Sequence, residues 1–189
     1  MPNSISLRNF IVGALLLLSV LSCQKKESKN VENEKIIADN YTLMVPKDFE
    51  KTNKLNELAK IQFQKVDEDL YFIVLEETKQ SFADAVKLKI HDTTPNLYGY
   101  FKVVTNHFKE ITKNLKVNDV GRTKIDSCNA IIFSMFGQTL DNGKSVFYRY
   151  ALIEDDKNYY QIMSWTNIHH KEKLIGRMDN IIHSFKMKK

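Results

Sequence analysis

The sequence has little glycine and proline, with six Gly and three Pro among 189 residues. This scarcity argues against a fibrous or loop-rich chain. Apolar residues make up 43% of the chain and charged residues 27%, which is typical of a soluble globular domain and excludes a disordered one. The length suits one domain plus an export segment.

The chain also lacks a strong charge of one sign. Its formal net charge is +5, and residues 1–22 contain one Arg and no acid, so the rest of the chain carries about +4. Acidic and basic residues alternate without a basic run. Because nucleic-acid binding requires a concentrated basic surface, we expect no nucleic-acid partner.

No apolar run is long enough to span a bilayer comfortably. Residues 10–21 (FIVGALLLLSVL) give 12 apolar or small residues after a polar start that carries Arg8. A transmembrane helix needs about 20 such residues. A short apolar run after a weakly positive start is typical of a signal peptide.

The apolar run ends at one of only two cysteines, Cys23. Residues 20–23 (VLSC) resemble a lipobox, although Leu is commoner than Val20 and Gly or Ala commoner than Ser22. The peptidase requires a small residue before the cut, and the nucleophilic thiol receives the lipid. We therefore predict a lipoprotein signal peptide over 1–22 and lipidation at Cys23. An ordinary cleaved signal with an incidental Cys23 and an uncleaved short anchor remain alternatives, whereas a core helix would need a polar face.

A lipidated Cys23 places the protein in the bacterial cell envelope, with the outer membrane favoured over the inner one. Two acyl chains hold a protein stably on a membrane. The other cysteine, Cys128, then has no intrachain partner, so the fold is not stapled by a disulfide. Residues 24–39 are charged and lack aromatics. We therefore predict a lipidated, flexible tether over 23–39 and a folded domain over 40–189.

The remaining pattern predicts strands, then helices, then a run of strands and a final helix. This order indicates an α+β domain with an antiparallel sheet. Several strands are apolar on both faces, so we expect an αβα sandwich with about six central strands, helices on both faces and a C-terminal helix. The expected strands are 41–45, 60–66, 70–75 and four within 115–166; the expected helices begin near Ser81, Asn96 and Asn167.

Three segments resemble the PsbP/DcrB-like superfamily over about residues 40–187. They are 41–49 (YTLMVPKDF), 126–130 (DSCNA) and 180–185 (NIIHSF), with Phe49 where the family usually has Trp. The resemblance implies an αβα sandwich. It also implies binding, because the family includes photosystem assembly subunits, a Ran-binding protein, lipoproteins and chaperones for hydrophobic segments, without shared catalytic residues.

No residue pattern predicts catalysis, a metal or a cofactor. His169 and His170 are adjacent and would point about 100° apart on a helix, unlike a zinc pair at i and i+4. The acidic turns 67–69 and 155–156 lack the Gly and terminal Glu of a calcium loop. Cys128 starts an apolar run and is interpreted as a packed thiol. We predict that the protein is not an enzyme.

Aromatic residues are concentrated on the last two strands. Tyr148, Tyr150, Tyr160 and Trp165 are the candidate binding surface, which would form a groove for a peptide or apolar ligand. The favoured alternative is that both strand faces pack under helices. The exposure of Trp165 and Tyr160 distinguishes the two hypotheses.

The sequence thus predicts a lipid-anchored, non-enzymatic binding or assembly module with a protein partner. The alternative is a carrier or chaperone for an apolar ligand or hydrophobic segment. A carrier would contain a concave apolar pocket of roughly several hundred Å³. An enzyme would instead show a cleft with clustered titratable groups.

Overall fold

The computed structural model describes residues 31–188. The predicted signal peptide and Cys23 lie outside the described residues. Within the described range, no helix is both long and apolar enough to cross a membrane.

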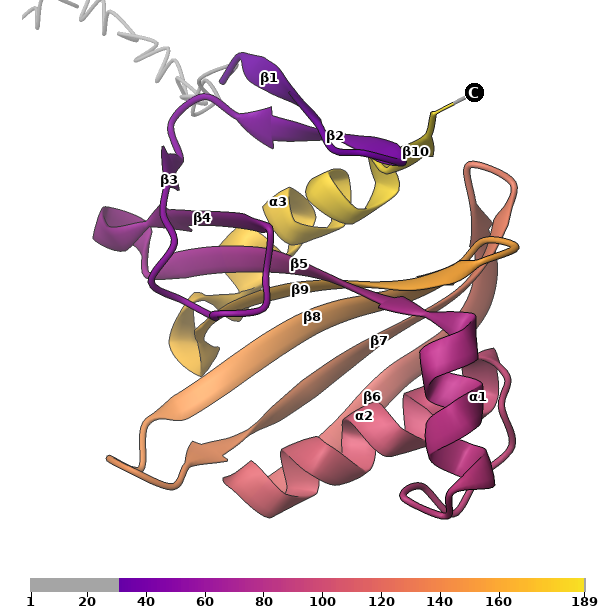
Figure 1. Ribbon diagram of the computed structural model, residues 1–189. Helices are drawn as coiled ribbons and strands as arrows, with labels where there is room; N and C mark the ends of the chain where they lie inside the picture. The colour runs from indigo at the N-terminus through magenta and orange to yellow at the C-terminus, as the bar shows by residue number, and fades with distance from the viewer. Residues whose placement is uncertain (1–30, 189) are drawn as a thin grey trace, which may run out of the picture. The chain divides into compact units, whose positions relative to one another are not determined.

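Seven antiparallel strands form the main sheet, in the order β3-β4-β5-β9-β8-β7-β6 (Figure 1). The predicted antiparallel sheet is therefore confirmed, and the strand beyond the expected six is the two-residue β3. The strands are β3 (Glu50–Lys51), β4 (Ile61–Lys65), β5 (Leu70–Thr78), β6 (Thr112–Ile125), β7 (Cys128–Thr139), β8 (Ser145–Glu154) and β9 (Asn158–Asn167).

Tight turns join the last four strands. Asp126 and Ser127 connect β6 to β7 with φ angles of 46° and 70°, a left-handed pair that suits a two-residue hairpin. Gly143, in the turn between β7 and β8, has φ 67°. Asp155 closes the turn to β9 by accepting hydrogen bonds from the backbone N–H of Lys157 (2.7 Å) and Asn158 (2.5 Å).

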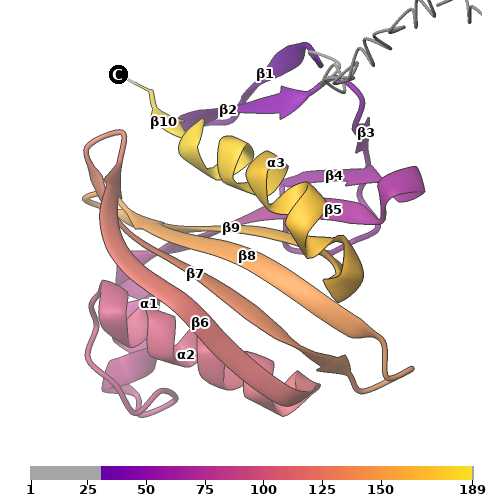
Figure 2. The same ribbon diagram turned by 180° about the vertical axis from the view of Figure 1, so that it is seen from behind.

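Helices cover both faces of the main sheet, as predicted. In Figure 1, α1 and α2 lie below the sheet and α3 lies above it; Figure 2 shows the same layers from behind. The Asn96 side chain caps α2 by accepting a hydrogen bond from the Gly99 N–H (2.8 Å). Helix α1 is capped by Thr78, three residues before the expected helix start at Ser81. The helices are α1 (Lys79–Lys87), α2 (Leu97–Ile111) and α3 (Lys171–His183), with single 3₁₀ turns η1 (Val66–Glu68) and η2 (Ile168–His170).

A second, three-stranded sheet in the order β1-β2-β10 shares the core of α3. It contains β1 (Asn33–Ile37), β2 (Tyr41–Pro46) and β10 (Lys186–Met187). The prediction of a flexible tether up to residue 39 is therefore wrong for 33–37. Strand β1 buries little beyond part of Ile36, so its sequence shows no apolar alternation that would reveal a strand.

Two apolar cores result, one on each face of the main sheet. The first lies under α3 and the small sheet, where the ring of Tyr41 stacks on Phe185 at 5.1 Å. The second lies under α1 and α2, where Tyr100 stacks on Tyr159 at 4.5 Å. Because side chains alternate along a strand, the central strands β7, β8 and β9 contribute to both cores.

Candidate binding cleft

The strand alternation divides the four predicted aromatic residues between the two faces. Tyr148 pairs directly with Trp165, and both lie on the α2 face together with Tyr150. Tyr160 has the opposite parity in β9 and points to the α3 face. It is fully buried there, 5.2 Å from the ring of Tyr41. The predicted binding surface is therefore wrong for Tyr160, because neighbouring strand residues face opposite sides.

The other three aromatic residues line a cleft of about 550 Å³ on the α2 face. Strands β5, β9 and β8 form its floor, α2 forms one wall and the β3–β4 loop (residues 52–60) forms the other. The floor contains Ile73, Leu75, Tyr148, Tyr150, Gln161, Met163 and Trp165; the α2 wall contains Tyr100, Val103, Val104, His107, Phe108 and Ile111; the loop wall contains Leu55, Asn56 and Leu58.

A buried amide fixes the loop wall. The Gln62 side chain is 4% exposed, and its Oε1 accepts hydrogen bonds from the backbone N–H of Leu55 (2.9 Å) and Asn56 (3.0 Å). Its Nε2 donates to the carbonyls of Asn56 (2.6 Å) and Ala59 (2.7 Å). Because a buried amide with all these bonds holds one conformation, the loop is a preformed wall of the cleft.

The cleft exists because α2 does not cover the whole sheet. Helix α2 packs over β6, β7 and β8, so part of β5 and β9 lies beyond it. The β3–β4 loop covers the other side and leaves an elongated opening between the two walls. The part of β5 from Tyr71 to Glu77 is roughly 20 Å long at about 3.3 Å per residue, and its residues from Ile73 onward run along the cleft.

One end of the cleft is apolar and aromatic. Trp165 stacks on Tyr71 at 5.4 Å, and Tyr148 meets the edge of Phe108 at 5.0 Å. Leu58 and Ile111, on the two walls, are 83% and 43% exposed. Exposed apolar side chains beside an apolar cleft are typical of a binding site.

The other end contains a chain of hydrogen bonds. The Tyr150 hydroxyl donates to Gln161 Oε1, Gln161 Nε2 donates to the Tyr100 hydroxyl (2.7 Å), and that hydroxyl donates to Glu77 Oε2 (2.9 Å). Burial raises the pKa of Tyr100, and the nearby Glu77 carboxylate raises it further. Burial alone raises the pKa of Tyr150. Both hydroxyls therefore stay protonated at neutral pH and can donate hydrogen bonds.

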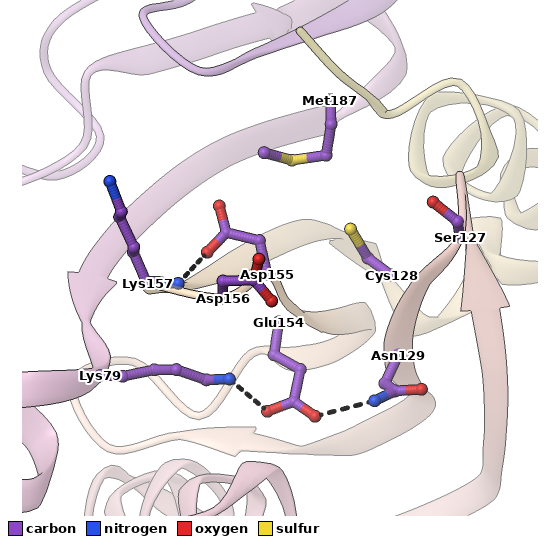
Figure 3. Close-up of a pocket in the computed structure, with 9 residues that line it drawn as sticks. All are labelled: Lys79, Ser127, Cys128, Asn129, Glu154, Asp155, Asp156, Lys157 and Met187. Atoms are coloured by element: carbon purple, nitrogen blue, oxygen red, sulfur yellow. Dashed lines mark hydrogen bonds and ion pairs between the residues drawn. The ribbon is translucent and has the colours of Figure 1, made fainter. Parts of the chain in front are cut away.

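A second hollow, of about 490 Å³, lies beside the β6–β7 and β8–β9 turns and is polar (Figure 3). Two of its three acidic residues, Glu154 and Asp155, already have partners. Figure 3 shows Glu154 between Lys79 (3.1 Å) and the amide of Asn129 (3.1 Å). Asp155 is held by its own turn and by the Tyr160 hydroxyl (2.8 Å). Both carboxylates are already occupied by local hydrogen bonds or an ion pair, so they do not form a cluster that is free to bind a ligand.

Cys128 lines this polar hollow and is half-buried. Burial raises the pKa of its thiol, and nearby carboxylates, Asp155 foremost, raise it further. A nucleophilic cysteine needs a lowered pKa, which positive neighbours provide. The Cys128 thiol therefore stays protonated and is a poor nucleophile.

The predicted histidine pair lies on η2, and both side chains are exposed. Among residues 31–188, no group of three or more His, Cys, Asp or Glu side chains is placed to hold a metal. Sequence reasoning missed the loop wall and Glu77. The loop has no periodic pattern, and a single Glu at a strand end resembles a solvent-exposed residue.

No family model and no curated protein matches the chain. Solved structures do match. The solution structure of cyanobacterial PsbP (CyanoP) from Synechocystis sp. PCC 6803 has 11% identity and a TM-score of 0.57, covering 86% of this chain and 96% of that one. LpqN of Mycobacterium tuberculosis, described as involved in cell envelope biogenesis, has 9% identity and a TM-score of 0.55, covering 85% and 92%.

A crystal structure from Bacteroides thetaiotaomicron has 11% identity and a TM-score of 0.50, and covers 84% of this chain and 49% of its own. Identities this low are informative about the fold alone. The arrangement of strands and helices agrees with the resemblance carried by residues 41–49, 126–130 and 180–185. The chain shares the fold of the PsbP and LpqN structures.

Proposed function

We propose that this domain is a non-enzymatic binding module of the bacterial cell envelope that holds an apolar ligand in the cleft between α2 and the β3–β4 loop. The observation that carries the proposal is the cleft itself, about 550 Å³ with an aliphatic and aromatic floor and a fixed loop wall. Small-molecule sites are typically clefts of about 300–1,000 Å³ with apolar walls and few polar groups. The sequence favours a protein-binding module, whereas the cleft favours the alternative of a carrier. The protein partner stays a prediction.

The envelope location rests on the pattern around Cys23 and is supported by the likeness to LpqN. We expect metabolic labelling with palmitate to mark the wild-type protein and not Cys23→Ala. Fractionation should then place the labelled protein in the outer membrane. An unlabelled wild-type protein would contradict the proposed anchor.

The ligand proposal can be tested through Trp165, because it is the chain's single Trp and lines the cleft. The neutral apolar dye N-phenylnaphthylamine should accept excitation energy from Trp165 and show saturable binding at one site. A dye signal that rises linearly without saturation would contradict the proposal.

Two matched variants locate the binding. Val103 and Val86 are both half-buried valines on helices of the same sheet face, but only Val103 lines the cleft. Val103→Lys should weaken dye binding at least about tenfold, because a charge in an apolar site costs desolvation energy. Val86→Lys should leave binding unchanged once folding is verified by circular dichroism. Equal losses in both variants would place the dye elsewhere.

A further inference from the structure

The polar end of the cleft has an unpaired charge. Glu77 lies on β5 directly opposite Tyr159 of β9, beyond the apolar floor formed by Ile73 and Leu75. Its side chain is half-buried. In the part of the chain that the structure describes, no Lys, Arg or His lies within 4.0 Å of its carboxylate.

The comparison with Glu154 shows that the lack of a nearby positive side chain is particular to Glu77 and not shared by its neighbours. Both residues flank Tyr159 in the same row of the sheet, one on β5 and the other on β8. The nearest lysine in sequence, Lys79, pairs with Glu154 at 3.1 Å. Glu154 therefore has its counter-charge within the domain, whereas Glu77 has none there.

The remaining hydrogen-bonding capacity at the Glu77 carboxylate is acceptor capacity. The Tyr100 hydroxyl already donates to Glu77 Oε2 and accepts from Gln161. The other Glu77 oxygen has only the Ser81 hydroxyl at 3.5 Å, at the limit of a hydrogen bond. A ligand group that fits here must donate hydrogen bonds, and a positive charge on it would complement the carboxylate.

We infer that the cleft selects amphiphiles with an apolar chain and a protonated amine, with the amine against Glu77 and the chain along Leu75, Met163 and Trp165. This inference rests on the proposed function and names its ligand class. The apolar chain is bound by the floor, and the amine is recognised by the carboxylate. A fatty acid would bring a second negative charge to Glu77 and be rejected.

The test compares three probes with the same twelve-carbon chain: dodecylamine, dodecanol and dodecanoate. Each is titrated into the folded domain below its micelle concentration, and Trp165 fluorescence reports binding. The amine should bind about tenfold more tightly than the alcohol, because only the amine adds a positive charge to the hydrogen bond that both can donate to Glu77. The carboxylate should bind more weakly than the alcohol.

Two variants test whether Glu77 causes the preference for the amine over the alcohol. Glu77→Gln removes the charge and should reduce the preference for the amine over the alcohol to about unity, with alcohol binding retained. Glu154→Gln is the matched control and should keep the wild-type preference, because Glu154 lies outside the cleft lining.

The possible outcomes separate the two proposals. If the three probes bind wild-type protein equally, or if Glu77→Gln keeps the preference, the amine inference is overturned and the cleft remains an apolar site. If none of the probes binds, the proposed function fails as well. The wild-type series requires no variant, so the inference can be tested even if Glu77→Gln does not fold.

Discussion

Tyr100 links α2 to the sheet at the polar end of the cleft. Its hydroxyl accepts from Gln161 and donates to Glu77, while its ring stacks on Tyr159 at 4.5 Å. The Tyr159 hydroxyl has no hydrogen-bond partner among residues 31–188. The two stacked rings therefore allow a matched comparison, because the hydroxyl is hydrogen-bonded in Tyr100 and not in Tyr159.

Tyr100→Phe should lower the free energy of unfolding by about 1–3 kcal/mol, because it leaves the Gln161 amide and the Glu77 carboxylate without a shared partner. Tyr159→Phe should change it by less than about 0.5 kcal/mol. Urea denaturation of both variants measures the difference. Equal effects would show that the hydrogen-bond chain contributes nothing beyond ring packing.

At this scale the sequence predicts the cleft in part. Tyr148, Tyr150 and Trp165 can be selected as aromatic residues on neighbouring strands, and the structure places all three in the cleft. Tyr160 and Trp165 lie five residues apart on one strand, so strand alternation alone places them on opposite faces. Gln161 and Glu77 gain their roles only from contacts with a distant helix.

At the scale of elements, the start of α2 depends on a glycine. A Cβ on Gly99 would lie 1.8 Å from the Thr94 carbonyl oxygen, a backbone atom of the preceding loop. Gly176, in α3, would place its Cβ in open space. The first glycine permits a close approach of loop and helix, whereas the second only weakens its helix.

The two substitutions to alanine should have opposite signs. Gly99→Ala should destabilise the domain by more than about 2 kcal/mol, because backbone cannot move aside cheaply. Gly176→Ala should stabilise it by about 0.5–1 kcal/mol, since alanine restricts the unfolded chain and favours a helix. Thermal and urea unfolding give both values. A neutral Gly99→Ala would contradict the tight packing at the start of α2.

Elements with strong local signals could be predicted from the sequence. The expected start of α2 near Asn96 agrees with the structure, in which the Asn96 side chain caps the helix. Strands β1 and β10 could not, because each is short and mostly exposed and exists only by pairing with β2. Pairing between ends of the chain leaves no periodic pattern in either segment.

At the scale of the whole molecule, the domain buries many tyrosine hydroxyls. Burial raises the pKa of Tyr159 to about 12. Among the six other tyrosines whose pKa it raises above the ordinary value near 10, four are raised most strongly. These are Tyr41, Tyr100, Tyr150 and Tyr160.

The sign of the resulting pH dependence follows from these raised values. Below about pH 10 the tyrosines are protonated in both states, so their contribution to stability is fully present. Above that pH the unfolded chain loses protons that the folded one keeps, so stability falls as pH rises toward 12 and beyond. We expect urea midpoints to be constant from about pH 7 to 9.5 and to fall steeply above pH 10.

Tyrosinate absorbance should therefore appear together with unfolding. Five or more tyrosines that titrate near pH 10 in protein with native circular dichroism would contradict the buried arrangement. The comparison needs no variant, because the absorbance and the circular dichroism are measured on the same sample.

The layered architecture as a whole could be predicted, because strands apolar on both faces require helices on both sides. The cleft could not, since it is the space that α2 and the β3–β4 loop leave uncovered. Its volume depends on where α2 and the β3–β4 loop end, and these two segments are far apart in the sequence. The sequence therefore predicts the fold better than the site.

Chemical-shift mapping by NMR tests the central claim most directly. On addition of N-phenylnaphthylamine, we predict saturable shifts at the amides of Leu55 and Val103, the methyl group of Met163 and the indole of Trp165. Residues of the α3 face, such as Tyr160, should stay unchanged. Shifts centred on that face or around Cys128, or no saturable shift anywhere, would contradict the account.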